Sequence, residues 1–191
     1  MPNPFIYGSS IVNHIPHLLT FPRTGSHYFD KLVYEKAGIS IDKSHSINRV
    51  FDKDSNKQKT IITIVRDPID TISSYLTLQE QGYGDTNLER IEETITNYVF
   101  MYRFLYDYAD CIIDFKDLVS RPDDVVERVF SLLEIKEEDY KFFNMVYNPW
   151  HEEYVPSSKT LPGYKKYKLD EHNIGLCYFY YNRILKRKIV I

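Results

Sequence analysis

TIITIVRDP, residues 60–68, is the stretch that decides the fold. Residues Thr60–Val65 are β-branched throughout and apolar at nearly every position, which is typical of a strand that helices cover on both faces of a parallel sheet. Arg66 ends the apolar run. Asp67 can then cap a helix, and Pro68 suits the first helical position, where a missing N–H costs nothing. The stretch therefore predicts a buried strand that leads directly into a helix.

The rest of the chain alternates between short apolar runs and longer amphipathic segments. The short runs predict strands over residues 15–21, 39–47 and 111–115. The amphipathic segments predict helices over 26–37, 68–81, 122–133, 137–146 and 170–188, and a capping box at Thr86 and Glu89 predicts a long helix that ends near Tyr108. Strands that alternate with helices indicate one α/β domain over residues 1–191, a three-layer sandwich with a central, mainly parallel sheet.

Composition excludes several classes of function. The chain has 191 residues, and 24 Lys and Arg stand against 27 Asp and Glu. A net charge of −3 gives no overall positive field for nucleic acid, so an anionic ligand has to be held by a local cluster. The two cysteines, Cys111 and Cys177, suggest neither a zinc site nor a disulfide. No run approaches the ~18–20 apolar residues of a membrane span, and residues 1–5 do not resemble a secretory signal. We expect a cytoplasmic protein with no nucleic-acid or membrane partner.

Residues 22–28 (PRTGSHY) lie where the first expected strand meets the first expected helix. Ligands bind at the carboxyl ends of parallel strands, and the backbone N–H groups and dipole of a helix N-terminus favour an anion there. The Arg23 guanidinium and two hydroxyls add further donors. The nucleoside triphosphatase loop GxxxxGK[ST] is a different pattern, because Ser26 and His27 follow Gly25 where that loop has Lys and a magnesium-binding hydroxyl. The residues therefore predict an anion site that does not take a magnesium triphosphate.

This loop resembles the 5′-phosphosulfate loop of the sulfotransferases that use the donor 3′-phosphoadenosine 5′-phosphosulfate (PAPS). The family's loop reads Pro-Lys/Arg-Ser/Thr-Gly-Ser/Thr-Ser/Thr-aromatic. The matching residues here are Pro22, Arg23, Thr24, Gly25, Ser26 and Tyr28. His27 departs from the pattern, because it replaces a small hydroxyl residue. The resemblance implies a P-loop-like nucleotide-binding fold in which residues 23–28, His27 included, bind the donor.

A second match follows the central strand. The family's 3′-phosphate site has a pattern like Arg-Asp/Asn-Pro-x-Asp-x-x-x-Ser-x-Tyr, and residues 66–75 read RDPIDTISSY. Tyr75 comes directly after Ser74 rather than two residues later. The resemblance implies that Arg66 contacts the 3′-phosphate of the donor and that Ser74 donates its hydroxyl to the same group. Helix capping explains the Asp-Pro of this motif, but it requires neither Arg66 nor Ser74.

The residues between the two motifs supply candidates for the chemistry. Sulfuryl transfer to an alcohol needs a base for the acceptor proton and positive charge where the leaving oxygen becomes negative. Lys43-Ser-His45 is similar to the Lys-Thr-His segment of the cytosolic family members. That similarity implies His45 as the general base, with Lys43 and Arg23 stabilising the transferring and leaving groups in an in-line displacement that needs no metal. His27 is a rival base, and some family members use a glutamate instead.

The remaining expectations concern a basic segment over the nucleotide, the product and the acceptor molecule. Lys165 lies in the basic stretch 159–168, where relatives close a basic segment over the nucleotide, although a solvated charged loop explains the stretch equally well. The product would be adenosine 3′,5′-bisphosphate (3′,5′-ADP), and the acceptor a hydroxyl on a carbohydrate or other small molecule. Two other classes fit the same residues, namely a P-loop kinase-like phosphotransferase and a non-catalytic nucleotide-binding module.

Overall fold

The computed structural model describes residues 16–38, 41–49, 60–83, 87–132, 134 and 167–187. Four strands form one sheet in the order β2-β1-β3-β4, and every described pairing is parallel. The strands are β1 (Pro16–Leu19), β2 (Asp42–Ser44), β3 (Thr60–Val65) and β4 (Cys111–Asp114). Because the strands are parallel, their carboxyl ends meet at one edge of the sheet. The α/β class expected from the sequence is confirmed.

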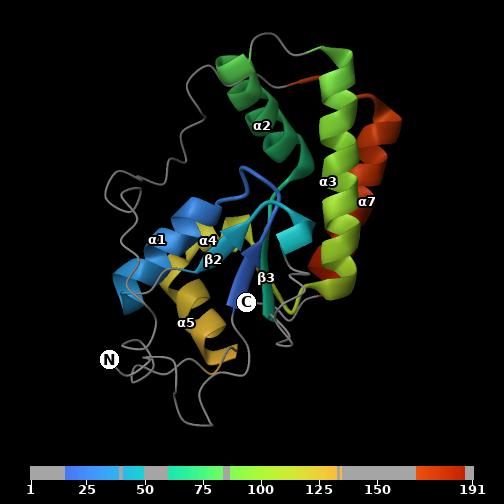
Figure 1. Ribbon diagram of the computed structural model, residues 1–191. Coiled ribbons are helices and arrows are strands. Elements are labelled where there is room, and N and C mark those ends of the chain that lie inside the picture. The colour runs from blue at the N-terminus through green and yellow to red at the C-terminus, as the bar shows by residue number, and fades with distance from the viewer. Residues whose placement is uncertain are drawn as a thin grey trace.

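Helices cover both faces of the sheet (Figure 1). One layer contains α1 (Ser26–Ala37), α4 (Phe115–Ser120) and α5 (Pro122–Leu132). The other contains α2 (Pro68–Tyr83), α3 (Leu88–Tyr108) and α7 (Glu171–Lys186). Ile62 and Ile64 of β3 belong to the core on the first face, whereas Ile61 and Val65 belong to the core on the second. Alternate residues of one strand therefore serve two cores, which is why TIITIV is apolar at nearly every position.

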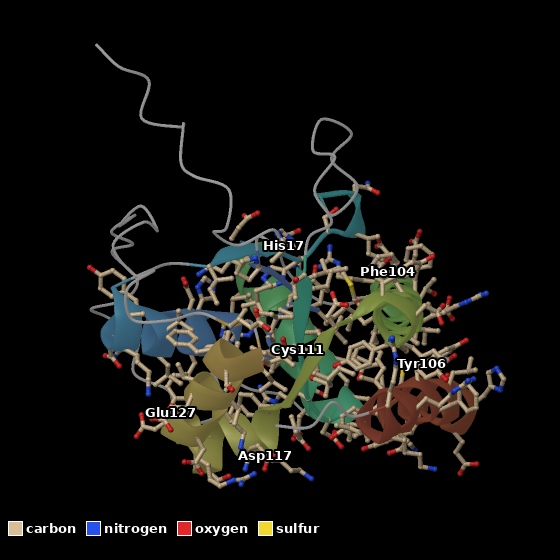
Figure 2. The ribbon with its side chains drawn as sticks, turned by 90° about the horizontal axis from the view of Figure 1, so that it is seen from below. His17, Phe104, Tyr106, Cys111, Asp117 and Glu127 are labelled. Atoms are coloured by element: carbon tan, nitrogen blue, oxygen red, sulfur yellow. The ribbon has the colours of Figure 1, made fainter. Side chains whose placement is uncertain are left out.

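The pairing of α3 with α7 fixes the second layer. Tyr106 lies between these helices in Figure 2. The guanidinium of Arg183 stands 4.3 Å from the centre of its ring and donates to its hydroxyl at 3.0 Å. Arg187 approaches the same ring at 5.8 Å. Cation–π and hydrogen-bonding contacts thus hold α7 along α3.

Two element ends differ from the sequence-based predictions. The residue that caps α3 is Asn87, whose side chain accepts the Arg90 N–H at 2.9 Å, whereas the expected capping residue, Thr86, lies outside the described residues. β4 ends at Asp114 rather than at residue 115, because the Asp114 carboxylate caps α4 and Phe115 already belongs to that helix. A single aspartate therefore ends the strand and starts a helix that the apolar pattern did not reveal.

The other described elements overlap the predicted ranges, although β1 ends at Leu19 rather than at Phe21. α1 and β3 have the predicted bounds, and α2 and α5 end within two residues of the predicted ones. β2 is shorter than the predicted strand over 39–47, and a short 3₁₀ turn, Ile47–Arg49, follows it. The helix predicted over 137–146 lies outside the described residues. In the described ranges, no helix has both the length and the apolar character needed to cross a membrane.

Candidate active site

The turn between β1 and α1 places an uncapped helix end at the carboxyl edge of the sheet. Gly25 precedes the helix with a φ of 102° and offers no side-chain cap, and the first turn of α1 contains no acidic residue. The first intrahelical hydrogen bond runs from the Phe29 N–H to the Gly25 oxygen at 3.0 Å. The N–H groups before Phe29 therefore point out of the helix end, where the helix dipole favours negative charge.

Two residues of this turn adopt backbone conformations that L-amino acids disfavour. Gly25 has a left-handed φ that favours glycine. A side chain is also excluded there by space, because a Cβ would lie 2.9 Å from the ring of Phe115. Arg23 has a φ of 71°, which costs an L-residue ~1–2 kcal/mol. Strained residues of this kind cluster at ligand sites, where the surrounding structure holds them in place.

Three other side chains of the loop face inward. Thr24 is fully buried, and its hydroxyl donates to the Phe21 oxygen at 2.9 Å and contacts the Thr20 hydroxyl. Because its hydroxyl donates to the Phe21 oxygen, Thr24 can serve an anion through its backbone N–H. Ser26 and Tyr28 are also buried, and the Tyr28 ring belongs to the core under α1.

Arg66 reaches the same edge from the end of β3. Its Nη1 donates to the Arg23 oxygen at 3.1 Å, and its guanidinium carbon lies 4.6 Å from the centre of the Phe115 ring. Two tyrosines of α3 hold its backbone: the Arg66 N–H donates to the Tyr102 hydroxyl at 3.3 Å, and the Tyr98 hydroxyl donates to the Arg66 oxygen at 3.4 Å. The guanidinium of the second motif is thus held against the loop of the first.

Ser74, in the second turn of α2, joins the motifs directly. The Arg23 Nε donates to the Ser74 Oγ at 3.2 Å. An arginine can only donate, so Ser74 accepts this bond and keeps its own O–H as a donor. The neighbouring Ser73 is occupied elsewhere, because its Oγ accepts the Tyr167 N–H at 3.2 Å. Of this serine pair, Ser74 is therefore the one that faces the arginine.

Asp67 connects the second motif to the last helix. Its Oδ1 caps α2 by accepting the N–H groups of Ile69 and Asp70 at 3.0 and 3.2 Å, as the sequence predicted. Its Oδ2 accepts the Tyr178 hydroxyl of α7 at 2.6 Å. Desolvation and the nearby carboxylate raise the pKa of Tyr178, which keeps the phenol protonated as the donor of this bond. This bond connects α7 to the start of α2.

His45 follows β2 at the same edge. Its Nδ1 lies 2.7 Å from the Thr20 oxygen. A carbonyl only accepts, so Nδ1 carries the proton and the lone pair of the neutral ring is on Nε2. The side chain is exposed. The contact therefore fixes the tautomer of the neutral ring, in which Nε2 is the accepting nitrogen that a general base requires.

Lys43 and His27 form a second basic group beside it. The Lys43 Nζ pairs with the Asp30 carboxylate at 2.6 Å and lies 3.3 Å from the His27 Nδ1. Desolvation and then the Lys43 charge lower the pKa of His27, and His45 and Arg23 add to the same effect, whereas the Asp30 carboxylate opposes it. The net effect favours the neutral form of His27.

Several residues of the site are absent from the sequence-based assignment. Tyr98 and Tyr102 stack at 4.0 Å and are fully buried, and burial raises the pKa of both phenols. Their four-residue spacing predicts a shared helix face, but nothing in the sequence indicates which backbone group the hydroxyls reach. No pattern in the sequence indicated a role for Asp30 or Phe115.

Lys165 lies outside the described residues. Within the described part of the chain, no group of three or more His, Cys, Asp or Glu could hold a metal ion.

No protein-family model and no curated protein matches the sequence. Among solved structures, the chain is similar to the crystal structure of mouse sulfotransferase SULT7A1 complexed with PAP, with a TM-score of 0.48 and 12% sequence identity. The likeness covers 85% of this chain and 74% of that chain. It concerns the path of the backbone, so we argue function from the side chains of this protein alone.

Proposed function

We propose that the protein is a sulfotransferase that moves a sulfuryl group from PAPS to a hydroxyl of a carbohydrate or other small-molecule acceptor. One observation carries the proposal: the two motifs predicted to bind anions, 43 residues apart in sequence, are joined by the bond from Arg66 to the Arg23 oxygen. The bond from Arg23 to Ser74 joins them a second time. Two adjacent cationic sites suit one ligand with two separate anionic groups, and PAPS is such a ligand.

Each end of the nucleotide has its own set of donors. The N–H groups at the start of α1 and the Arg23 guanidinium would hold the 5′-phosphosulfate. Arg66 and the hydroxyl of Ser74 would hold the 3′-phosphate. A hydrogen bond to a charged group contributes about 1.5–3 kcal/mol, so the 3′-phosphate site alone can distinguish 3′,5′-ADP from a nucleotide that lacks this phosphate.

The chemistry follows from the two ends of the transfer. The acceptor oxygen attacks sulfur while the His45 Nε2 removes the hydroxyl proton, and the bond between sulfur and the 5′-phosphate oxygen breaks. The leaving oxygen gains negative charge, which the α1 N–H groups and Arg23 stabilise. Holding donor and acceptor in line supplies a further part of the rate. The products are the sulfated acceptor and 3′,5′-ADP.

Calorimetry with 3′,5′-ADP, AMP and Mg-ATP tests this proposal. The wild type is expected to bind 3′,5′-ADP most tightly. Of the three ligands, only this one has both a 5′-phosphate and a 3′-phosphate, whereas AMP and Mg-ATP lack the 3′-phosphate. Arg66→Ala should lower the affinity for 3′,5′-ADP by about 10- to 100-fold, the loss of a charge-assisted contact, and leave the affinity for AMP nearly unchanged.

Arg103→Ala serves as the matched control, because Arg103 is an exposed arginine of α3. Its affinity for 3′,5′-ADP should equal that of the wild type, and the melting temperatures of all three proteins report whether the fold is intact. Equal wild-type affinities for 3′,5′-ADP and AMP would contradict the proposal. Tighter binding of Mg-ATP would favour a kinase-like phosphotransferase.

A further inference from the structure

A chain of polar contacts lies beside the α1 N-terminus. The Asp30 Oδ2 lies 2.6 Å from the Lys43 Nζ, and that Nζ lies 3.3 Å from the His27 Nδ1. The Asp30 Oδ1 accepts the Ile41 N–H at 3.1 Å, just before β2. The chain of contacts therefore starts inside α1, crosses to β2 and returns to the first turn of α1.

Asp30 is the fixed end of this chain. Its side chain is fully buried, whereas that of Lys43 is 21% exposed. A buried carboxylate is costly unless it is paired and hydrogen-bonded, and here both oxygens have a partner in the ammonium and the backbone N–H. The ion pair with Asp30 therefore anchors Lys43 close to His27. It also restricts how far Lys43 can extend toward the transferring and leaving groups that the sequence led us to expect it to stabilise.

The position of Lys43 decides which nitrogen of His27 carries the proton. An ammonium can only donate hydrogen bonds, so the His27 Nδ1 must accept, and in the neutral ring the proton is then on Nε2. The tautomer is the opposite of that of His45, whose Nδ1 donates to the Thr20 oxygen. One histidine of the site thus has an accepting Nε2 and the other a donating Nε2.

We propose that Asp30 is a positioning residue that anchors Lys43 and, through it, keeps the proton of the His27 ring on Nε2, where it serves as a hydrogen-bond donor for the 5′-phosphosulfate oxygens. This inference rests on the proposed function. His27 occupies the position of a small hydroxyl residue in the loop that it resembles, and an imidazole N–H replaces the hydroxyl as a donor. The base of the reaction is then His45, and His27 is a ligand-binding residue.

Nitrogen NMR of the ¹⁵N-labelled, ligand-free protein tests the first half of this inference. The His27 ring should show a protonated Nε2 and an unprotonated, hydrogen-bonded Nδ1 near neutral pH. In Asp30→Asn, which keeps the shape of the side chain, the ring should exchange between both tautomers. Lys43→Met removes the donor directly and serves if Asp30→Asn does not fold. A protonated Nδ1 in the wild type, or an unchanged ring signal in the variants, overturns the inference.

Binding of 3′,5′-ADP to three His27 variants tests the second half. Glutamine places an amide N–H near the position of the Nε2, whereas asparagine places it near the Nδ1. His27→Gln should therefore retain most of the affinity, and His27→Ala and His27→Asn should each lose about tenfold or more, the loss of a hydrogen bond to a charged group. A loss in His27→Gln as large as that in His27→Ala overturns the donor role. Failure of the wild type to bind 3′,5′-ADP would instead refute the proposed function, and the NMR result stands apart from it.

Discussion

Replacing His45 by alanine is expected to lower kcat for sulfuryl transfer by about 10²- to 10⁴-fold, the usual contribution of a general base. The Nδ1 of His45 bonds to the Thr20 oxygen at 2.7 Å, so the substitution removes the Nε2 that is proposed to accept the hydroxyl proton. The affinity for 3′,5′-ADP should stay within about twofold of the wild type, because no phosphate contact is assigned to this residue. Initial rates with PAPS and calorimetry with 3′,5′-ADP measure the two quantities.

His172→Ala is the matched control, since His172 is an exposed histidine of α7. Its kcat should equal that of the wild type. A His45→Ala enzyme with unchanged kcat would remove His45 from its assigned role. If the wild type binds 3′,5′-ADP but transfers no sulfuryl group to any hydroxyl acceptor, the protein is a non-catalytic nucleotide-binding module.

Gly25→Ala is expected to combine a loss of stability with a loss of binding. The new Cβ would lie 2.9 Å from the Phe115 ring, at a backbone φ of 102°. A left-handed φ costs an L-residue ~1–2 kcal/mol and overpacking a further ~1–3 kcal/mol, so the free energy of unfolding should fall by roughly 2–5 kcal/mol. Displacing the turn also moves the N–H groups assigned to the 5′-phosphosulfate. Urea unfolding and calorimetry with 3′,5′-ADP measure both effects.

Gly38→Ala separates the two causes of the stability loss expected for Gly25→Ala, the steric clash with Phe115 and the left-handed backbone. Gly38 has a φ of 66°, and a Cβ there would meet nothing within 4 Å, so the same substitution should cost ~1–2 kcal/mol and leave binding unchanged. Adding Phe115→Leu to Gly25→Ala removes the ring and should recover part of the lost stability. The account of the turn is wrong if the two glycine variants have equal stability and equal affinity.

Much of the fold was predictable, because the decisive signals are local. The apolar run over 60–65, the Asp-Pro cap after it and the helical spacing over 26–37 each depend on neighbours in sequence. The end of β4 was not predictable to the residue. Phe115 belongs to a strand by residue type, and the bond from the Lys116 N–H to the Asp114 carboxylate makes it the start of a helix instead. The choice also depends on the packing of α4 against α5 and β4, which a local pattern does not contain.

The candidate site was predictable to the level of its motifs but not of its contacts. Parallel strands carry Arg23 and Arg66 to one edge, so their proximity follows from topology. The inward turn of the Thr24 hydroxyl and the pairing of Lys43 with Asp30 depend on groups that approach only in the folded chain. Asp30 is one acid in the middle of an amphipathic helix, and its sequence neighbours do not distinguish it from a solvated side chain.

A crystal structure with bound 3′,5′-ADP tests most directly whether two motifs at one sheet edge bind the two phosphates of a single nucleotide. Electron density for the 5′-phosphate is expected at the N-terminus of α1. The 3′-phosphate is expected within hydrogen-bonding distance of the Arg66 guanidinium and the Ser74 hydroxyl. Density for the nucleotide in another part of the protein, or a 3′-phosphate that contacts neither residue, would contradict this binding mode.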